Sequence, residues 1–460
     1  MSGPASAAVT CVTHAGERLD TVIRDEMARA IGHLRPRHIV IKPNWVLHET
    51  TPSHPIAALV TDARVIAATV RAAADLFPAA ERITVGDCPL QRADWPLLLR
   101  QSGLEPLIAE IHARYPNRVA FRDLRQEVFT YADGRLVPQA GAPHGDPLGY
   151  QEVHLGATSH LEAISDEADR FSIHDHDREK TQANHRRGDH RYFVSRSFLD
   201  ADLVINVPKW KTHSKSGVTG ALKNLVGING DKAYLPHFRK GAPRWGGDEY
   251  WDSGRWLYWL QNALRDFTRT YCWWGYKLLR PIWLVIKRLR SAVLRGAEGP
   301  PPDFYVGGGS WYGNRTIWRM IYDLNMVIER VDAGGVLRDA PQRAYFCIVD
   351  GLVCGEGEGP LSPTPRPLDW LIFGRDPFAI DATLAWFMGF DPERLPIIAE
   401  RRSFLGEWGR FALDALPVSV DGVTRMLTAF PINHGFAPPP GWAGHVERRV
   451  TTTESAVVTS

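Results

Sequence analysis

The sequence predicts an α/β protein with two lobes, built on mostly parallel sheets with covering helices. Two observations lead to this prediction. Apolar, strand-like runs alternate with segments of helical periodicity along much of the chain, which is the order typical of parallel sheets connected by helices. The length of 460 residues also allows two or three domains and a large buried core.

The first hundred residues predict two strand–helix units. Residues 37–47 predict a buried strand whose apolar run ends at Pro43. Residues 57–77 predict a helix, with Ala, Val, Ile and Leu on one stripe. A second strand is expected over 82–89 and a helix over 93–104. These units form the start of a first lobe, which we place at 1–250.

Residues 131–196 are polar and rich in histidine, with four histidines between 174 and 190. A histidine-rich run can bind a metal ion, but here the spacing is irregular and Asp, Arg and Lys are interleaved. This pattern favours a solvated excursion from the fold over a metal site.

Strand patterns return at 201–208, 344–351 and 368–377. The helix expected over 376–390 has a recognisable start, because Asp376 can cap the free amides and Pro377 suits the first turn. The later elements predict a second lobe over 303–440, followed by a disordered tail over 441–460.

Between the lobes lies a predicted helical insertion, residues 251–302, that is amphipathic and rich in Trp. Its central part, residues 255–296, has nine basic residues and one acidic residue, Asp266, and no uncharged run of about 18–20 residues that could span a bilayer. One interpretation is a helix lying in the membrane interface, with contact through 255–296. The other is a helical hairpin that packs on the protein itself or on a second subunit of a homo-oligomer.

Composition excludes several classes of function. The net charge is +2 and the basic residues are local, so nucleic-acid binding is not expected. The five cysteines are scattered without a C-x-x-C pair, so we expect neither a zinc ribbon nor an iron–sulfur cluster, and the odd count fits a reducing compartment. No signal peptide is evident, which predicts a cytoplasmic protein, with association to the inner membrane surface if the insertion binds lipid.

Four loops follow predicted strands and carry polar side chains. Because ligands of open parallel sheets bind beyond the carboxyl ends of the strands, we expect these loops to meet at one crevice between the lobes. Lys42 and Asn44 in the first loop can hold an anionic or carbonyl group. A hard divalent cation is a further possibility, with Asp87, Asp350 and Glu356 as its candidate ligands. The alternatives for these carboxylates are a lysine partner for Asp87 and a mobile acidic turn around Glu356.

The densest motif, NVPKWKTHSKSGVTGALKNLVGING, covers residues 206–230. Lys209 and Lys211 are two residues apart, so on an extended segment they project to the same side and can clamp a carboxylate or phosphate. Lys223 is expected in a helix begun near 217–219, where desolvation would lower its pKa and allow base or nucleophilic chemistry. His213 is the candidate for proton transfer, because imidazole titrates near neutral pH.

These residues resemble the domain-of-unknown-function 362 family. The resemblance rests on IKPNWV (41–46), VGDCP (85–89), INVPKWKTHSKSGVTGALKNLVG (205–227), VDGLVCGEGEGP (349–360) and GRDPFAIDATLAWFMGF (374–390). GDEY (247–250) and GNRTIW (313–318) resemble a long-form branch associated with bacterial envelope-polysaccharide gene clusters. Many family members carry ferredoxin-like cysteine motifs, which this chain lacks.

A more distant similarity concerns the spacing H-x3-G-x-[ST]-G-x2-K, formed by His213, Gly217, Thr219, Gly220 and Lys223. It is similar to the segment of nickel-pincer lactate racemases in which a histidine works beside the lysine that carries the pincer cofactor. The resemblance implies a metal-side or catalytic role for His213 and a cofactor-bearing or substrate-binding role for Lys223. The further histidines of those racemases have no match here, so the cofactor stays unidentified.

The leading hypothesis is therefore an enzyme that acts on a small anionic substrate, such as a sugar acid or a lipid-linked glycan precursor, by proton transfer of the epimerisation type. His213 and Lys223 would be catalytic. The alternative is a non-catalytic anion- or lipid-binding adaptor at the inner membrane surface in envelope polysaccharide biosynthesis. The expected substrate-binding residues are Lys42, Asn44, Lys209, Lys211, Thr219 and Asn224.

Overall fold

The computed structural model describes most of the chain and leaves one long gap. The described residues are 7–49, 51–132, 135–138, 144–166, 170–173, 178–251 and 307–448. The predicted helical insertion at 251–302 lies outside these ranges except for its first residue, and so do residues 449–460 of the predicted tail. No helix within the described ranges is long and apolar enough to cross a bilayer.

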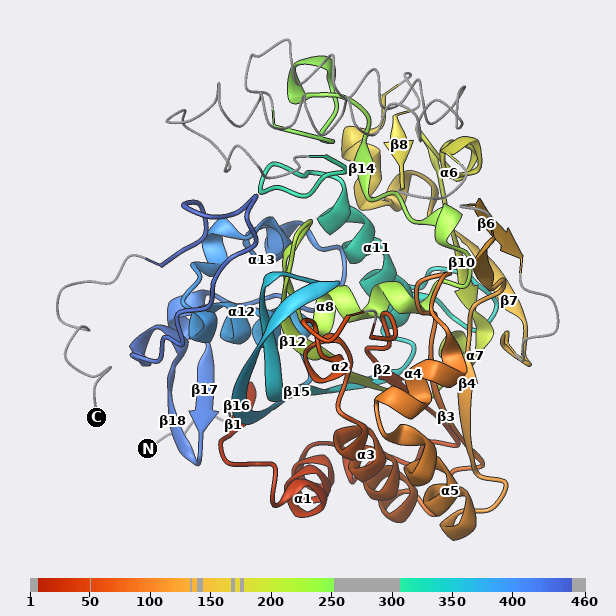
Figure 1. Ribbon diagram of the computed structural model, residues 1–460, viewed down its shortest axis with the longest axis vertical. Helices are drawn as coiled ribbons and strands as arrows, with labels where there is room; N and C mark the ends of the chain where they lie inside the picture. The colour runs from red at the N-terminus through yellow and green to blue at the C-terminus, as the bar shows by residue number, and fades with distance from the viewer. Residues whose placement is uncertain are drawn as a thin grey trace.

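One large mixed sheet runs through the molecule (Figure 1). In order across the sheet its main strands are β18 (Val423–Met426), β17 (Pro417–Val420), β1 (Val9–Val12), β16 (Ser362–Gly374), β15 (Ala344–Glu358), β11 (Leu203–Val207), β2 (His38–Pro43), β3 (Arg82–Asp87) and β4 (Val119–Asp123). The five strands from β15 to β4 are parallel to one another. The α/β class and the mostly parallel sheet are therefore confirmed.

Strands from both predicted lobes are hydrogen-bonded within this one sheet. β11 of the first lobe pairs with β15 of the second, and β1 pairs with β16. A further strand, β12 (Lys209–His213), follows β11 along the chain and pairs in parallel with β15. The chain then turns back into β13 (Gly217–Thr219), which pairs antiparallel with β12. The boundaries of the two lobes stay a prediction, but the sheet crosses from one to the other.

Helices cover both faces of the sheet (Figure 1). The lower face is covered by α1 (Leu19–Ile31), α3 (Ala63–Leu76) and α5 (Leu104–Arg114). The upper face is covered by α8 (Ala221–Asn224), α11 (Ile317–Arg330), α12 (Pro377–Met388) and α13 (Pro396–Ala399).

The central strands are mostly apolar because both of their faces are buried. In β2, Ile39 and Ile41 belong to the lower apolar cluster, whereas Val40 belongs to the upper one. The same alternation occurs in β11, where Ile205 points into the lower cluster and Val204 into the upper. Successive side chains of a strand point to opposite faces, so a continuous apolar run is what a sheet between two helical layers requires.

Smaller sheets lie beside the upper layer, near the top and right of Figure 1. They are β7 (Tyr150–His154) with β10 (Asp189–Ser195) and β9 (His185–Arg186), β8 (Phe171–Ser172) with β14 (Phe238–Arg239), and β5 (Phe129–Ala132) with β6 (Arg135–Pro138). The described residues also form the short helices α2 (Ile56–Leu59), α4 (Trp95–Gln101), α6 (Arg178–Asn184) and α7 (Arg196–Leu199).

The prediction of a solvated excursion at 131–196 is wrong for the described histidines of its later part. His185 and His190 are buried, and they contact each other through their Nδ1 atoms at 3.3 Å. His160 is also buried and lies 2.7 Å from the carboxylate of Asp323 on α11. These histidines are core residues with hydrogen-bond partners. His174 and His176 lie outside the described residues.

Two helix predictions also need correction. The predicted helix at 57–77 is split into α2 and α3, because Asp62 caps a new start by accepting from the amide of Arg64. Residues 217–219, expected to begin a helix, form β13 instead, and α8 begins at Ala221. In contrast, the start of α12 is as predicted, since Asp376 accepts from the amides of Phe378 and Ala379.

We expect Asp376→Ala to lower the free energy of unfolding by about 1–2 kcal/mol, because the first amides of α12 lose their acceptor. The amide of Gly409, which donates to the same carboxylate at 2.8 Å, loses its partner as well. The shift of the urea midpoint measures this loss. Asp414→Ala, at an exposed carboxylate, is the matched control and should leave the midpoint unchanged. Equal shifts in the two variants would contradict the capping role.

Candidate functional site

A cavity of about 440 Å³ opens beyond the carboxyl ends of β2, β3 and β12. Three of the four predicted strand-end loops meet there, the loops that carry Lys42, Asp87 and the 206–230 motif. From the fourth loop, only Pro360 and Leu361 line the cavity. The expectation of a shared crevice is thus confirmed for three loops. Its place at the end of the strands is the usual ligand position in open parallel sheets.

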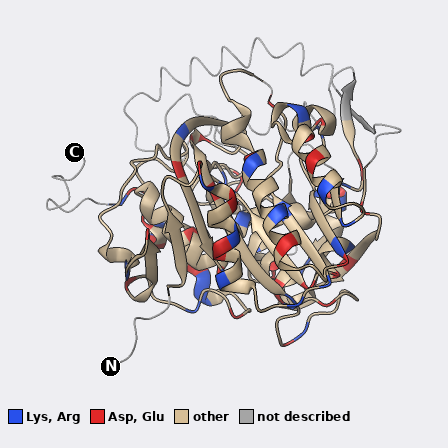
Figure 2. Ribbon diagram, turned by 90° about the horizontal axis from the view of Figure 1, so that it is seen from below, with Lys and Arg blue, Asp and Glu red and all other residues tan. Residues whose placement is uncertain are grey.

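The lining of the cavity is strongly basic. Asp87 is the only carboxylate that lines it among the described residues, and it already lies 2.8 Å from the ammonium of Lys42. The helices of the lower layer carry charges of both signs, because Lys and Arg lie among Asp and Glu there (Figure 2). For example, Arg71 of α3 pairs with Asp20 of α1. The positive excess is therefore local to the cavity. Its basic residues are Lys42, Arg92, Lys211, Lys215, Lys223 and Lys232.

The Lys42–Asp87 ion pair forms the floor of the site. Both side chains are buried, and Asp87 also accepts a hydrogen bond from the amide of Trp45 at 2.8 Å. Gly227 lies directly against the pair, where a Cβ would come within 2.0 Å of the Asp87 carboxylate and 2.7 Å of the Lys42 ammonium. Only glycine allows the backbone to approach this closely. Of the two roles considered for Asp87, the lysine partner is the one seen.

Two asparagines join the elements that meet at the cavity. The side-chain amide of Asn224 on α8 donates to the carbonyl of Lys42 at 3.1 Å and to Asn206 at 2.7 Å. Its oxygen accepts from Asn44 at 3.1 Å. The oxygen of Asn44 in turn accepts from the ammonium of Lys211 at 3.2 Å. Asn44 and Asn224 both line the cavity, so this network fixes β2, β12 and α8 around it.

Lys209 and Lys211 do not form the common clamp that their spacing suggested. Lys209 is buried in an ion pair with Asp350, at 2.8 Å, and does not line the cavity. Lys211 does line it, but its ammonium donates to the carbonyl of Leu59 at 2.5 Å and to Asn44. Burial and the charges of Lys209 and Lys223 hold the pKa of Lys211 well below its usual range. Lys211 is thus a structural donor in the wall.

Lys223 is the side chain with the properties expected of a reactive group. It lies on α8 and lines the cavity. In the part of the chain that the structure describes, its ammonium has no hydrogen bond or ion pair. Burial, followed by the charges of Lys232 and Lys42, lowers its pKa to about 7. A large fraction of Lys223 is therefore a neutral amine at neutral pH.

The short helix that carries Lys223 is held in place by a carboxylate from α12. Asp381 is fully buried and accepts from the amides of Ala221 at 2.6 Å and Leu222 at 3.2 Å, the first residues of α8. A Cβ at Gly220 would lie 2.1 Å from the same carboxylate. Burial raises the pKa of Asp381 to about 7. Its place in the helix was predicted, and the cap it provides for α8 was not.

His213 lies in the cavity wall as a neutral imidazole. Its Nδ1 accepts from the backbone amides of Lys215 at 3.1 Å and Ser216 at 3.3 Å. An amide can only donate, so Nδ1 carries the lone pair and Nε2 carries the hydrogen. Burial, followed by the charge of Lys223, holds the pKa of His213 well below its usual range. The ring therefore has a donor at Nε2, lies in the cavity lining and resists protonation.

Thr219 contributes a second donor. It is buried and lines the cavity, and its hydroxyl has no hydrogen-bond partner within the described ranges. A buried hydroxyl without a partner costs free energy, so such a group is uncommon outside functional sites. A ligand oxygen in the cavity would supply the missing partner.

Three further groups lie in the wall: Lys215, Lys232 and His237. Lys215 belongs to the basic 206–230 motif but was given no role of its own, and Lys232 and His237 were not predicted. The ammonium of Lys232 donates to the carbonyl of Cys88 at 2.6 Å, and that of Lys215 donates to the carbonyl of Gly308. Lys232 lies two residues beyond the end of the motif, so a longer window would have included it. No local pattern marks His237.

The three candidate metal ligands are not brought together. Asp87 pairs with Lys42, Asp350 pairs with Lys209, and Glu356 pairs with Arg366 at 2.9 Å. In the described parts of the chain, no group of three His, Cys, Asp or Glu side chains is arranged to hold a metal ion. Within the described residues, these three carboxylates therefore do not form a site for a divalent cation.

Comparison with known proteins identifies the family. The model of the family described as Domain of unknown function (DUF362) matches residues 149–386, more than half of the chain, and the chain belongs to this family. The matched range contains the 206–230 motif, whereas Lys42 and Asp87 precede it. No curated protein matches the chain.

One similar solved structure is a crystal structure of a Thermotoga maritima protein from the Northeast Structural Genomics Consortium. It is 11% identical with a TM-score of 0.34, and the alignment covers 77% of this chain and 54% of that one. The match thus spans about half the length of that protein.

We expect the amine of Lys223 to react with acetic anhydride with a midpoint near pH 7, because only the neutral amine is nucleophilic. An ordinary lysine reacts with a midpoint at about pH 10.4. Mass spectrometry of the peptide that contains Lys223 measures the rate, with Nα-acetyl-lysine in the same reaction as the reference. The signal should vanish in Lys223→Arg. A midpoint equal to that of the reference would contradict the neutral amine.

Proposed function

We propose that this member of the DUF362 family is an enzyme that transfers a proton at a carbon atom of a small anionic substrate. The observation that carries the proposal is Lys223, an amine with a pKa of about 7 in a cavity whose other cations exclude a cationic ligand. An enzyme lowers the pKa of a lysine in this way when it needs the amine as a base or a nucleophile.

The charge of the cavity determines the class of substrate. Among the described residues, six basic side chains line it, and the one carboxylate there, Asp87, is already paired with Lys42. An anion is therefore the ligand that reduces the electrostatic free energy of the site most. A volume of about 440 Å³ accommodates a sugar acid or the head of a lipid-linked glycan precursor.

The hydrogen bonds of the site favour a particular division of roles. The neutral amine of Lys223 accepts a proton from the carbon next to the carboxyl group of the substrate. The electron pair of the broken C–H bond moves toward the carboxyl group, and negative charge develops on its oxygen. His213 Nε2–H and the hydroxyl of Thr219 donate hydrogen bonds to that oxygen. A water molecule then delivers a proton to the other face of the carbon, which gives the epimer, and the ammonium of Lys223 loses its proton to solvent.

This division assigns to Lys223 the proton transfer that the sequence predicts for His213. Protonation of the Nδ1 of His213 would break two backbone hydrogen bonds beside several cations. A neutral imidazole that donates is well suited to an oxyanion. Lys223, for which base or nucleophilic chemistry was expected, is the better base.

Deuterium exchange tests the proposal while the product is still unidentified. Hydroxy acids and uronic acids are incubated with the protein in D₂O, and loss of the signal of the hydrogen next to the carboxyl group is followed by ¹H NMR. We expect exchange of at least one substrate, slowed about 10²–10⁴-fold in Lys223→Met because the base is removed. Lys180→Met, at a surface lysine paired with Asp231, is the matched control and should exchange at the wild-type rate.

The pH dependence separates the base from a simple anion clamp. A base works when neutral, so the exchange rate should rise with pH through about 7 and then level off. A clamp works when charged, so binding would strengthen as the pH falls below about 7. Binding of the acids without any exchange, tightest at low pH, would contradict the enzymatic proposal and favour the non-catalytic adaptor.

A further inference from the structure

A second histidine, His237, lines the same cavity from the upper, smaller sheets. It lies between the short turn Lys232–Tyr234 and β14, whereas His213 and Lys223 come from β12 and α8. The cavity therefore has one histidine from the main sheet and one from the region that covers it.

The tautomer of His237 is opposite to that of His213. The Nδ1 of His237 lies 2.7 Å from the carbonyl oxygen of Leu235. A carbonyl can only accept, so Nδ1 carries the hydrogen and Nε2 carries a lone pair. His213 has the reverse arrangement, because its Nδ1 accepts from backbone amides. Both rings line the cavity, and at Nε2 one ring can donate a hydrogen bond whereas the other can accept one.

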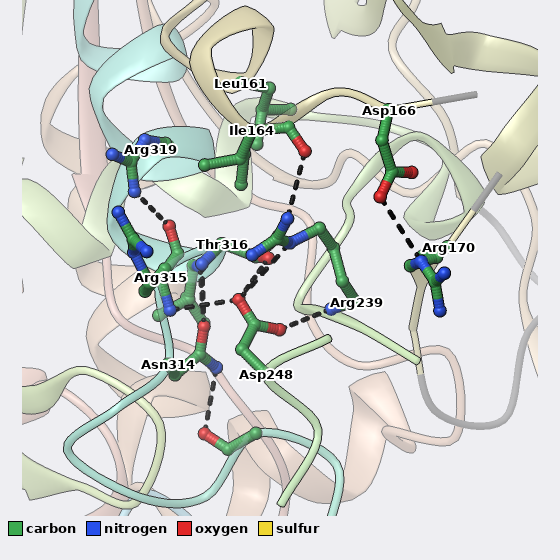
Figure 3. Close-up of polar contacts among 12 residues, drawn as sticks. Leu161, Ile164, Asp166, Arg170, Arg239, Asp248, Asn314, Arg315, Thr316 and Arg319 are labelled. Carbon is green, nitrogen blue, oxygen red and sulfur yellow. Dashed lines mark hydrogen bonds and ion pairs between the residues drawn. The ribbon is translucent and has the colours of Figure 1, made fainter. Parts of the chain in front are cut away.

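The acceptor is held in place by a set of buried contacts around β14. The carbonyl of His237 accepts from the side-chain amide of Asn314 at 2.9 Å. Asp248 binds the amide of Arg239 on one side and the amide of Arg315 and the hydroxyl of Thr316 on the other (Figure 3). These contacts join the His237 segment to the start of α11.

The acceptor also persists at neutral pH. Burial, followed by the charges of Lys223 and Lys215, holds the pKa of His237 well below its usual range, so Nε2 stays unprotonated. The same positive surroundings limit what can donate to it. An ammonium group would be repelled by the basic lining, so the donor must be neutral.

We propose that the substrate is a hydroxy acid, whose hydroxyl group donates a hydrogen bond to Nε2 of His237 while an oxygen of its anionic group accepts from Nε2–H of His213. The proposal rests on the proposed function, because it identifies the substrate class of the same cavity. A hydroxyl is the neutral donor that a sugar acid carries on the carbon bonded to its carboxyl group. An α-amino acid carries an ammonium at that position and is excluded by the charge of the site.

Glycerate and propionate form a pair of probes for this inference, because they have the same charge and chain length and differ in their hydroxyl groups. We expect the wild-type protein to bind glycerate about three- to tenfold more tightly, as measured by ligand-observed NMR titration at pH 7. His237→Phe removes the acceptor but keeps an aromatic ring of similar size. In this variant the two affinities should become equal, through loss of glycerate affinity alone.

Two further variants complete the test. His237→Gln restores an acceptor oxygen and should recover part of the preference, whereas His213→Phe should weaken both acids by a similar factor. Unchanged propionate binding in His237→Phe shows that its cavity is intact. An undiminished preference for glycerate in His237→Phe, or equal binding of both acids by the wild type, would overturn the hydroxyl assignment alone. Failure of both acids to bind the wild type would overturn the proposed function together with this inference.

Discussion

The site depends on the burial of more positive than negative charge where β2, β12 and β15 come together. Three lysines, Lys42, Lys209 and Lys211, are buried there, with two carboxylates to neutralise them, Asp87 and Asp350. A buried charge without a partner is costly, so the third lysine must be accommodated in another way. Lys211 donates to neutral oxygens, and its pKa is lowered by burial and by Lys209. The Asn44–Asn224 network supplies one of these oxygens and fixes α8 at the same time.

The chemistry of the cavity follows from this excess. Burial lowers the pKa of Lys223 most, and the charges of Lys232, Lys42 and Lys215 lower it further, so its amine is partly neutral at pH 7. Burial, followed by the charges of Lys223 and Lys215, likewise keeps His213 and His237 neutral. In neutral imidazoles the backbone can select the tautomer, and it does so in opposite senses for the two rings. Positive charge around the cavity thus excludes cations, frees a base and preserves one donor and one acceptor.

The sequence was sufficient for the class of the fold and for the meeting of three strand-end loops at one cavity, because both depend on local patterns. Apolar runs predict strands, and the polar residues after Pro43 and Val207 mark where the strands end. It was not sufficient for the partners. The pairing of Lys209 with Asp350 joins residues 141 positions apart, and the hold of Asp381 on α8 spans 160. For His237, the hydrogen bond that its backbone carbonyl accepts from Asn314 spans 77 positions, beyond the range of any spacing rule. The tautomer of His213 depends on residues two and three positions away, yet only the observed turn shows that its ring accepts from them.

The charges of the cavity act as one coupled set, which changes how single residues should be understood. Lys223 lowers the pKa of His213, His237 and Lys211, and its own pKa is lowered by Lys232, Lys42 and Lys215. Loss of one cation therefore shifts several groups at once, and effects of substitutions within the set will not be additive. An anionic substrate acts on the same set with the opposite sign: once bound, it favours protonation of every lysine near it. For Lys223 to remain a base in the complex, the anionic group must lie closer to the other cations than to Lys223. That requirement places the carboxyl group of the substrate toward the remaining lysines and the carbon that loses its proton toward α8.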